Sequence, residues 1–491
     1  MTDLDDPCPT APELRPDRLT GRASAYRVAS RAFAASGGIV GAGAALLRPD
    51  AAVKLLLLTR LVSFVSTPIT LILVATRFSP VTQGFYYTFT QITQFTILLE
   101  LGLGMVLTQF ASQEFAHLHW TPAGSLAGSD SPLRHLLGIL VKACRWYVAV
   151  ALVAVVTFIP AGLAFFASQG HAHGVDYARP WVILVALTAA GMLAVPISAV
   201  IEGCGRVLDV TRLRFVQAIT SSVLLWAGIL GHQALYCAAA AAIGPVIVPA
   251  VWFVRRYRGL LGQLRRGLRS QADARVSWRT ELLPMQWRIA VSWIAGFLVF
   301  ALFTPLLFRY QGAAVAGRMG MSLTVANVPF VLGMSWLMTR TPGYGTLIRQ
   351  RSWRELDATA LTGTLQAVVV WAAASVSLLV GVKAADIWLP SFGQRVLGVG
   401  TLAALCLGSL VNVLMQAMAG YLRAHKQEPY VAISVGTGLL VAAASWITAR
   451  FGTPGAMAIA YAAVTGLVEL PVAVAIFMRK RREWHAGAEK T

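Results

Sequence analysis

The sequence predicts an all-α integral membrane protein with twelve transmembrane helices, arranged as two lobes of six helices each. Three observations lead to this fold class. Of the 491 residues, 57% are apolar and only 13% carry a charge. The apolar residues gather in long runs, and about 20 residues suffice for an α-helix to cross about 30 Å of hydrocarbon. Lys and Arg residues gather in alternate gaps between these runs.

Twelve runs have the required length. They cover approximately residues 55–76, 85–109, 143–167, 181–201, 215–231, 234–254, 288–308, 313–338, 361–382, 396–421, 430–449 and 456–478. The longest basic segment, Arg255 to Trp287, separates the sixth run from the seventh and divides the spans equally. The predicted organisation is therefore a cytoplasmic N-terminal tail (1–54), an N-lobe (55–258), a cytoplasmic linker (259–286), a C-lobe (287–478) and a basic C-terminal tail (479–491).

The basic residues also predict the orientation of the chain. Of the 41 Lys and Arg residues, 33 lie in the two tails and the even-numbered loops, counting Arg145 and Arg288 at the adjoining span edges, and six lie in the odd-numbered loops. Cytoplasmic loops carry an excess of Lys and Arg, so both termini are expected in the cytoplasm. The two remaining cations, Arg60 and Arg318, lie inside predicted spans, where topology does not explain them.

The net charge of +20 does not indicate a nucleic-acid-binding protein. Such proteins concentrate their charge on a water-facing domain, whereas the charged residues of this chain lie between the membrane spans. Anionic lipid headgroups are the expected partner. No phosphate-binding loop motif occurs, and every loop is too short for a catalytic domain. The five cysteines have no paired spacing and His171 and His173 are too few to bind a metal. We therefore expect a transporter, not an enzyme, without a cofactor or metal.

Ionisable side chains inside spans are candidates for function, because burying Arg or Asp at the centre of a span costs roughly 2.5–3.5 kcal/mol. Glu100 in the second span and Glu469 in the twelfth lie deepest, and we expect them to respond to ions or to fix helix packing. Arg60 heads a polar stripe on the first span that continues through Ser63, Thr67 and Thr70. Arg60 and Arg318 are therefore expected to line a cavity, although snorkelling to the membrane surface is the alternative.

Uncharged polar residues suggest the remaining wall of such a cavity. Gln91 and Gln94 share one stripe of the second span, and Asn412 and Gln416 lie four residues apart on the tenth. Residues at this spacing lie on one face of a helix. They are expected either to line a substrate cavity or to join neighbouring helices by hydrogen bonds.

Two stretches carry a resemblance to a known family. Residues 84–89 (Gly-Phe-Tyr-Tyr-Thr-Phe), 99–104 (Leu-Glu-Leu-Gly-Leu-Gly) and 109–114 resemble the second span of polysaccharide-biosynthesis membrane proteins, and Glu202 to Arg214 resembles their Gly- and Arg-containing connection. These proteins include the O-antigen-type flippases of the multidrug/oligosaccharidyl-lipid/polysaccharide (MOP) exporter superfamily. The resemblance covers the architecture of about residues 55–478.

The resemblance implies a MATE-like fold in a bacterial inner membrane, with two bundles rocking about a central cavity. It implies transport of a lipid-linked oligosaccharide, with Arg60 and Arg318 holding the diphosphate, and polysaccharide polymerases or glycosyltransferases as protein partners. The deep carboxylates favour a second hypothesis, a cation-coupled multidrug antiporter of the same superfamily. A non-transporting scaffold of a polysaccharide synthase complex is the third, whereas the signature of the major-facilitator fold is missing after the second span.

Overall fold

The computed structural model describes residues 51–100, 102–168, 174–269, 300–388, 390–425, 427 and 429–488, and those from 58 onward form one compact unit. The predicted tail as far as residue 50, residues 270–286 of the predicted linker and residues 288–299 of the predicted seventh span lie outside the described residues. The loop histidines His171 and His173 lie outside them as well.

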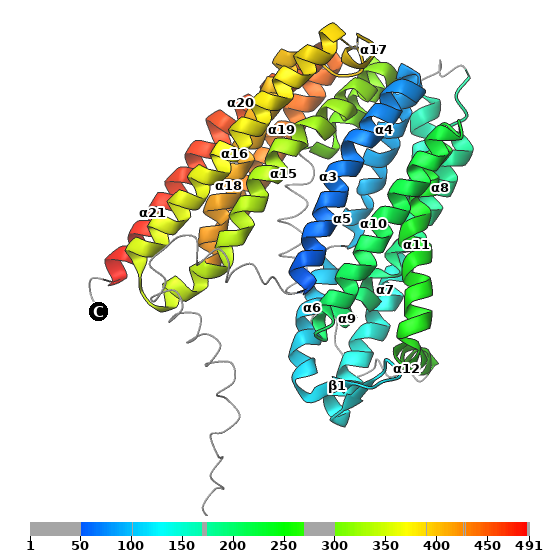
Figure 1. Ribbon diagram of the computed structural model, residues 1–491, viewed down its shortest axis with the longest axis vertical. Coiled ribbons are helices and arrows are strands. Elements are labelled where there is room, and N and C mark those ends of the chain that lie inside the picture. The colour runs from blue at the N-terminus through cyan, green and yellow to red at the C-terminus, as the bar shows by residue number, and fades with distance from the viewer. Residues whose placement is uncertain are drawn as a thin grey trace, which may run out of the picture. The chain divides into compact units, whose positions relative to one another are not determined.

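The described residues in the first half of the chain are almost entirely helical (Figure 1). Its helices are α3 (Ala51–Arg77), α4 (Pro80–Gln94), α5 (Thr96–Glu100), α6 (Leu103–Glu114), α7 (Asp130–Ala167), α8 (Ala178–Met192), α9 (Val195–Gly203), α10 (Val207–Leu230), α11 (Tyr236–Arg256) and α12 (Arg258–Arg269). Ser79 begins α4 because its hydroxyl accepts a hydrogen bond from Thr82 N at 3.0 Å, and Pro80 suits the first helical position. Gly102, with φ 67°, separates α5 from α6.

The second half repeats this helical construction. Its helices are α14 (Phe303–Gln311), α15 (Ala313–Arg349), α16 (Trp353–Trp388), α17 (Pro390–Gly393), α18 (Val399–Ala424), α19 (Val431–Phe451), α20 (Pro454–Ala463), the π-helix η4 (Val464–Glu469) and α21 (Leu470–Ala488). Helices α20, η4 and α21 continue one another and together form the last predicted span.

The predicted membrane fold is confirmed in its main features. Within the described residues, nine helices are long and apolar enough to cross a membrane, and the broken pair Pro80–Glu100 and Leu103–His117 makes a tenth. The first predicted span corresponds to α3, whose apolar part from Val65 to Arg77 is shorter, and the seventh is described only in part. These helices indicate an integral membrane protein, whereas the count of twelve and the cytoplasmic location of the termini stay predictions.

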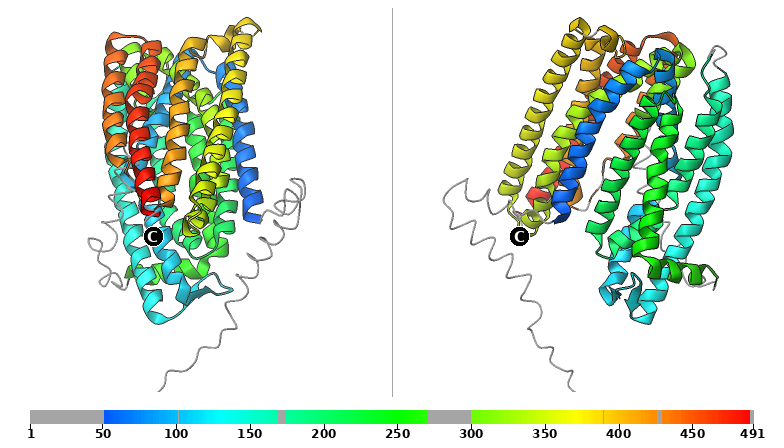
Figure 2. Two further views of the ribbon diagram at one scale, coloured as in Figure 1. Left: turned by 90° about the vertical axis from the view of Figure 1, so that its left-hand side faces the viewer. Right: turned by 45° about the vertical axis from the view of Figure 1, so that its right-hand side comes forward.

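A small module at one end of the N-lobe was not predicted. The 3-10 helix η1 (Phe115–His117) leads into an antiparallel hairpin of β1 (Leu118–Trp120) and β2 (Leu126–Gly128), in which His119 pairs with Ala127. Helix α12 lies crosswise to α11 beside this hairpin (Figures 1 and 2). The first residues of the predicted linker, as far as Arg269, are therefore helical and belong to the N-lobe.

The helices of each half pack mainly on one another. The principal contact between the halves joins α4 to α14 and α15. Its apolar core is continuous across the halves, because Phe85 and Phe166 of the first half belong to the same buried cluster as Phe308 and Met319 of the second. The two lobes therefore meet at α4, α14 and α15.

Candidate functional site

A cavity of about 810 Å³ lies between the two halves of the chain. Helices α3 and α4 supply one side of it, and α15 and α18 supply the other. Its lining combines hydroxyl and amide groups with the apolar side chains of Leu, Val, Ala, Pro and Phe residues. The polar residues are Thr67, Gln91, Gln94, Thr324, Asn327, Ser409, Asn412 and Gln416.

The amides predicted from helical spacing all lie on this cavity. Gln91 and Gln94 reach it from α4, and Asn412 and Gln416 reach it from α18. Asn412 donates hydrogen bonds to the Tyr461 hydroxyl at 2.7 Å and to Gly408 O at 3.2 Å, so its orientation is fixed. The side-chain amides of Gln91 and Gln416 form no hydrogen bond with another residue in the described part of the chain. The structure therefore brings these amides together, and their role in binding stays a prediction.

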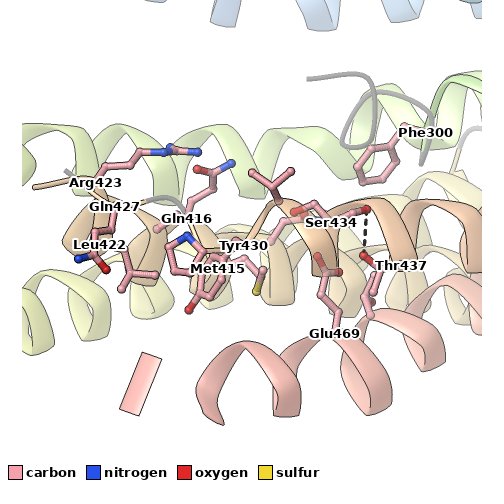
Figure 3. A pocket seen from close by; sticks show the side chains of 15 residues that line it. Phe300, Met415, Gln416, Leu422, Arg423, Gln427, Tyr430, Ser434, Thr437 and Glu469 are labelled. Atoms are coloured by element: carbon pink, nitrogen blue, oxygen red, sulfur yellow. Dashed lines mark hydrogen bonds between the residues drawn. The ribbon is translucent and has the colours of Figure 1, made fainter. Parts of the chain in front are cut away.

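A smaller cavity of about 150 Å³ adjoins the first and contains the deep carboxylate of Glu469. The two cavities share Phe300, Asn412 and Gln416 in their linings. Figure 3 shows the Glu469 carboxylate beside Thr437, whose hydroxyl donates to Ser434 O at 3.3 Å. Glu469 ends the π-helix η4, and such short π-helical segments occur frequently at functional sites.

The described lining of the larger cavity carries no formal charge. Arg423 and Glu469 are the charged residues in the described lining of the smaller one. The Arg318 side chain is exposed on α15 and lines neither cavity. The Arg60 side chain lies outside the described residues, although its backbone belongs to α3. The predicted cationic site is therefore not assembled by Arg318 in this conformation.

Glu100 does not lie near the cavities as Glu469 does, although both residues are predicted to lie deep within their spans. It ends α5, immediately before the break at Gly102, and the Tyr147 hydroxyl of α7 faces it. Neither described cavity includes Glu100 in its lining. Of the two deep carboxylates, the structure therefore places only Glu469 beside the candidate binding space.

The contact that closes the cavity on one side uses Gln83, Gly317 and Arg395, which the sequence analysis did not select. The buried amide of Gln83 in α4 donates to Gly317 O at 3.0 Å and to Arg395 O at 3.1 Å, and its oxygen accepts from Arg395 Nη1 at 3.4 Å. Burial lowers the pKa of Arg395. Gly84 lies directly against Ala313 and Gly317, where a Cβ atom on either glycine would meet backbone atoms of the other half.

Aromatic rings extend this closure. The Phe85 ring lies 4.9 Å from the Phe308 ring and 5.6 Å from the Phe166 ring, centroid to centroid. The Phe165 and Phe166 rings lie 5.5 and 5.4 Å from Phe308. Because aromatic pairs at these distances contribute beyond their buried area, this cluster stabilises the closed contact. The Gly-aromatic start of the second span was a visible signal for it.

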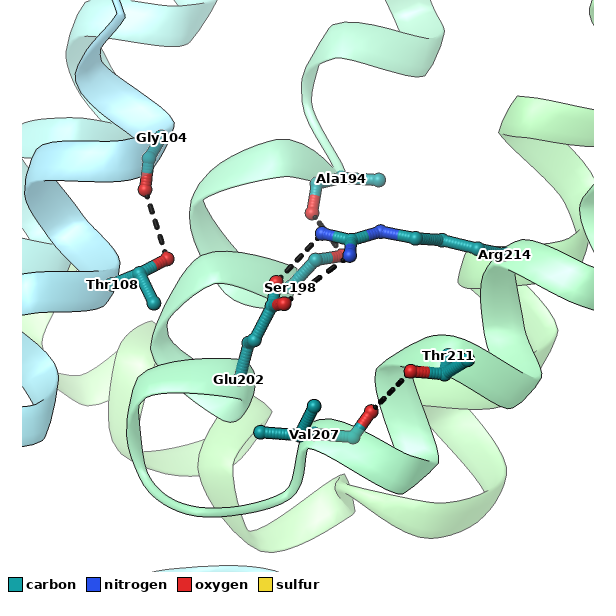
Figure 4. Close-up of polar contacts among 8 residues, drawn as sticks. All are labelled: Gly104, Thr108, Ala194, Ser198, Glu202, Val207, Thr211 and Arg214. Carbon is teal, nitrogen blue, oxygen red and sulfur yellow. Dashed lines mark hydrogen bonds and ion pairs between the residues drawn. The ribbon is translucent and has the colours of Figure 1, made fainter. Parts of the chain in front are cut away.

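The opposite end of the N-lobe is held by polar contacts near its loops. Arg214 donates to both carboxylate oxygens of Glu202, at 3.2 and 2.6 Å, which joins α9 to α10 (Figure 4). Asp209 is buried and accepts from the Tyr257 hydroxyl at 2.8 Å and from Arg256 Nε at 3.2 Å. Burial and the neighbouring Asp209 raise the pKa of Tyr257. These pairs join α9, α10 and the end of α11 to one another.

The described residues contain no group of three or more His, Cys, Asp or Glu side chains that would hold a metal ion. None of the described cysteines forms a disulfide bond; they are Cys144, Cys204, Cys237 and Cys406. The arrangement is that of a binding space with one adjoining carboxylate.

Comparisons with known proteins find likeness in structure alone. No protein-family model and no curated protein matches the chain. An inward-facing multidrug resistance MATE family transporter of the MOP superfamily matches with a TM-score of 0.64 and 13% identity, over 87% of this chain and 95% of that one. An outward-facing MATE transporter gives 0.53 and 14%, over 90% and 96%. The lipid II flippase MurJ, in an inward closed conformation, gives 0.57 and 11%, over 85% and 87%.

At these identities the likeness shows the fold. The chain thus has the fold of MOP-superfamily transporters, as the sequence resemblance predicts, and this fold agrees with the apolar helices in indicating an integral membrane protein.

Proposed function

We propose that the chain is a membrane flippase or exporter that moves a lipid-linked oligosaccharide across a bacterial inner membrane by alternating access. The observation that carries this proposal is the 810 Å³ cavity between the lobes, with amides and hydroxyls from both sides. Its volume lies within the roughly 300–1,000 Å³ of typical ligand pockets. The fold shared with a lipid II flippase supports a lipid-linked cargo.

The chemistry of the lining suits a sugar. An amide offers both donors and acceptors, and a hydroxyl offers one donor and two acceptor lone pairs, so Gln91, Gln416 and Thr324 match the hydroxyl groups of a glycan. A buried polar group that finds no partner costs about 1–3 kcal/mol. Amides that line the cavity would therefore favour a hydroxyl-rich cargo over a purely apolar one.

The diphosphate would bind nearer the cytoplasmic mouth in this proposal. Arg60 lies seven residues before Thr67 on α3, which puts both on one face of the helix, and Thr67 lines the cavity. Arg can hold phosphate oxygens through two parallel hydrogen bonds. Arg318, which is exposed here, would have to reach the cargo in another conformation.

The contacts between lobes support an inward-facing state under this proposal. They gather at the start of α4 and around Gly317 and Arg395. The basic loops predict that this end faces outward, so the cavity would open toward the cytoplasm, with both termini there. The higher TM-score with the inward-facing MATE transporter agrees with this assignment. Polysaccharide polymerases or glycosyltransferases would supply or receive the glycan.

A cation-coupled multidrug antiporter is the second candidate, and the position of Glu469 favours it. Its carboxylate lies in the cavity that adjoins the binding space. Ionisable residues within spans commonly mark ion or proton pathways. Both candidates work by alternating access through the same cavity, and they differ in the cargo that they move.

The cavity amides provide the test. We expect the double variant Gln91→Leu/Gln416→Leu to lower the movement of a fluorescent lipid-linked oligosaccharide between the leaflets of proteoliposomes by at least about tenfold. The loss of two hydrogen bonds at about 1 kcal/mol each accounts for this magnitude. The measurement is the fraction of label accessible to an external quencher over time.

Gln350→Leu is the matched control, since Gln350 is exposed beyond α15, outside both described cavities. It should transport as the unaltered protein does. If the unaltered protein moved a cationic drug but no lipid-linked sugar, the antiporter would replace the flippase. Equal sugar transport by the double variant and the unaltered protein would contradict the assigned binding surface.

A further inference from the structure

Helix α12 covers an end of the N-lobe with one side and leaves a basic side exposed. It follows α11 after a single residue, Tyr257, and lies crosswise to it (Figures 1 and 2). Its sequence, Arg-Gly-Leu-Leu-Gly-Gln-Leu-Arg-Arg-Gly-Leu-Arg, separates apolar from basic residues by helical spacing. The two sides have different environments.

The apolar side packs on the N-lobe itself. Leu260 and Leu264 are buried in one cluster with Leu140 and Val141 of α7. Gln263 donates to Leu126 O at 2.7 Å and accepts from Leu126 N at 3.1 Å, so the hairpin holds the helix as well. The position of α12 is therefore fixed by the lobe, and no second protein is needed to cover Leu260 and Leu264.

The basic side presents four exposed arginines: Arg258, Arg265, Arg266 and Arg269. Arg258 and Arg266 donate to backbone carbonyls of their own segment, Val254 O at 2.7 Å and Gly262 O at 3.4 Å. In the described part of the chain no carboxylate forms an ion pair with any of the four. The helix itself contains no acidic residue, so this surface carries uncompensated positive charge.

Neighbouring helices place this charge where their exposed apolar surface ends. Ile247, Val251 and Val254 form an exposed apolar stripe along α11, 43–53% exposed, and Arg258 Nε, just beyond the end of α11, donates to Val254 O at 2.7 Å. On α7, Lys142 and Arg145 are the last charges before the apolar run that ends at Ala167. Arg145 Nη2 donates to Leu268 O at 3.4 Å, which ties α12 to that level.

We propose that the arginine side of α12 binds the phosphate groups of anionic phospholipids. The stripe on α11 would contact the acyl chains, and the arginines would meet the headgroups where the stripe ends. Leu268, 40% exposed beside Arg269, adds apolar surface at the same level. Such binding holds the N-lobe at a fixed depth in the membrane, independently of any cargo in the cavity.

The test uses the full-length protein in an uncharged detergent, titrated with short-chain phosphatidylglycerol, with the thermal unfolding midpoint as readout. A ligand that binds only the folded protein raises this midpoint with its concentration. We expect phosphatidylglycerol to raise it and phosphatidylcholine to leave it unchanged. The variant Arg265→Gln/Arg266→Gln/Arg269→Gln should need at least about tenfold more phosphatidylglycerol, because each arginine contributes about fivefold to attraction by anionic lipid.

Two further variants distinguish a site from general charge. Arg349→Gln/Arg354→Gln/Arg482→Gln removes the same charge from exposed positions of α15, α16 and α21 in the second half of the chain and should keep its response. Arg265→Lys/Arg266→Lys/Arg269→Lys should retain most of it, because a lysine still attracts phosphate as a point charge. Equal losses in the two glutamine variants, or an equal response to inorganic phosphate at the same concentration, would overturn the proposal.

Discussion

Gly84→Val is expected to reduce transport by at least tenfold and to shift the protein away from the inward-facing state. A Cβ atom at Gly84 would meet the backbone of Ala313, and the facing Gly317 allows no retreat, since its own Cβ position lies 2.7 Å from Gly84 N. Overpacking a buried contact costs about 1–3 kcal/mol. Because only the closed contact is destabilised, this cost shifts the equilibrium between states by roughly 5- to 100-fold.

Spin labels report this shift directly. Val81 and Gln394 are exposed residues on the two sides of the contact. In a protein without native cysteines, spin labels at Val81→Cys and Gln394→Cys therefore report the distance across the contact by pulsed electron paramagnetic resonance. We expect a short distance in the otherwise unaltered protein and a longer one with Gly84→Val. Gly381→Val in α16 is the control, because a Cβ there meets nothing within 4 Å. An unchanged distance with Gly84→Val would contradict the role of this contact.

Glu469→Gln is expected to remove the dependence of transport on an ion gradient. The carboxylate lies in the cavity that adjoins the binding space, beside Thr437 and at the end of the π-helix. The amide keeps the shape of the side chain but binds neither a proton nor a cation as a carboxylate does. In proteoliposomes, imposed proton or sodium gradients should accelerate transport by the unaltered protein by at least about tenfold and leave the variant unaffected.

Glu100→Gln provides the contrast, because Glu100 faces Tyr147 and lines neither described cavity. Its transport should keep the gradient dependence, with any loss appearing in thermal stability instead. The reverse result, coupling lost with Glu100→Gln and kept with Glu469→Gln, would move the ion site to the N-lobe.

The lengths of the apolar runs predict most of the fold, because hydrocarbon thickness imposes a length that a sequence displays directly. The same holds for Gln91, Gln94, Asn412 and Gln416, since helical spacing alone puts each pair on one face. Which face turns toward the cavity depends on packing between helices. For these amides, the polar stripe and the cavity wall coincide in the structure.

Residues whose position depends on distant packing were not predictable in this way. Counting from the ends of a span gives the depth of Glu100 and Glu469 but not the direction in which either points. The break at Gly102 adds a change of direction just after Glu100. The contact of Gln83 with Gly317 joins residues 234 positions apart, and one sequence gives no sign of such pairing.

The hairpin and α12 were missed for a different reason. Residues 259–286 were predicted to be a linker because they carry many basic residues. Leu260 and Leu264, however, recur at helical spacing among the arginines. That periodicity was a usable signal for a packed helix. As far as Arg269, the structure shows that the arginines lie on one side of a helix whose other side packs on the N-lobe.

The most direct test of alternating access is the accessibility of Gln91→Cys in sealed, oriented vesicles, in a cysteine-free background that still transports. A membrane-impermeant maleimide is applied from either side, with and without lipid-linked oligosaccharide. We expect labelling only from the side of the termini without cargo, and labelling from both sides during transport. A cysteine that reacts from the same single side under both conditions would contradict the account.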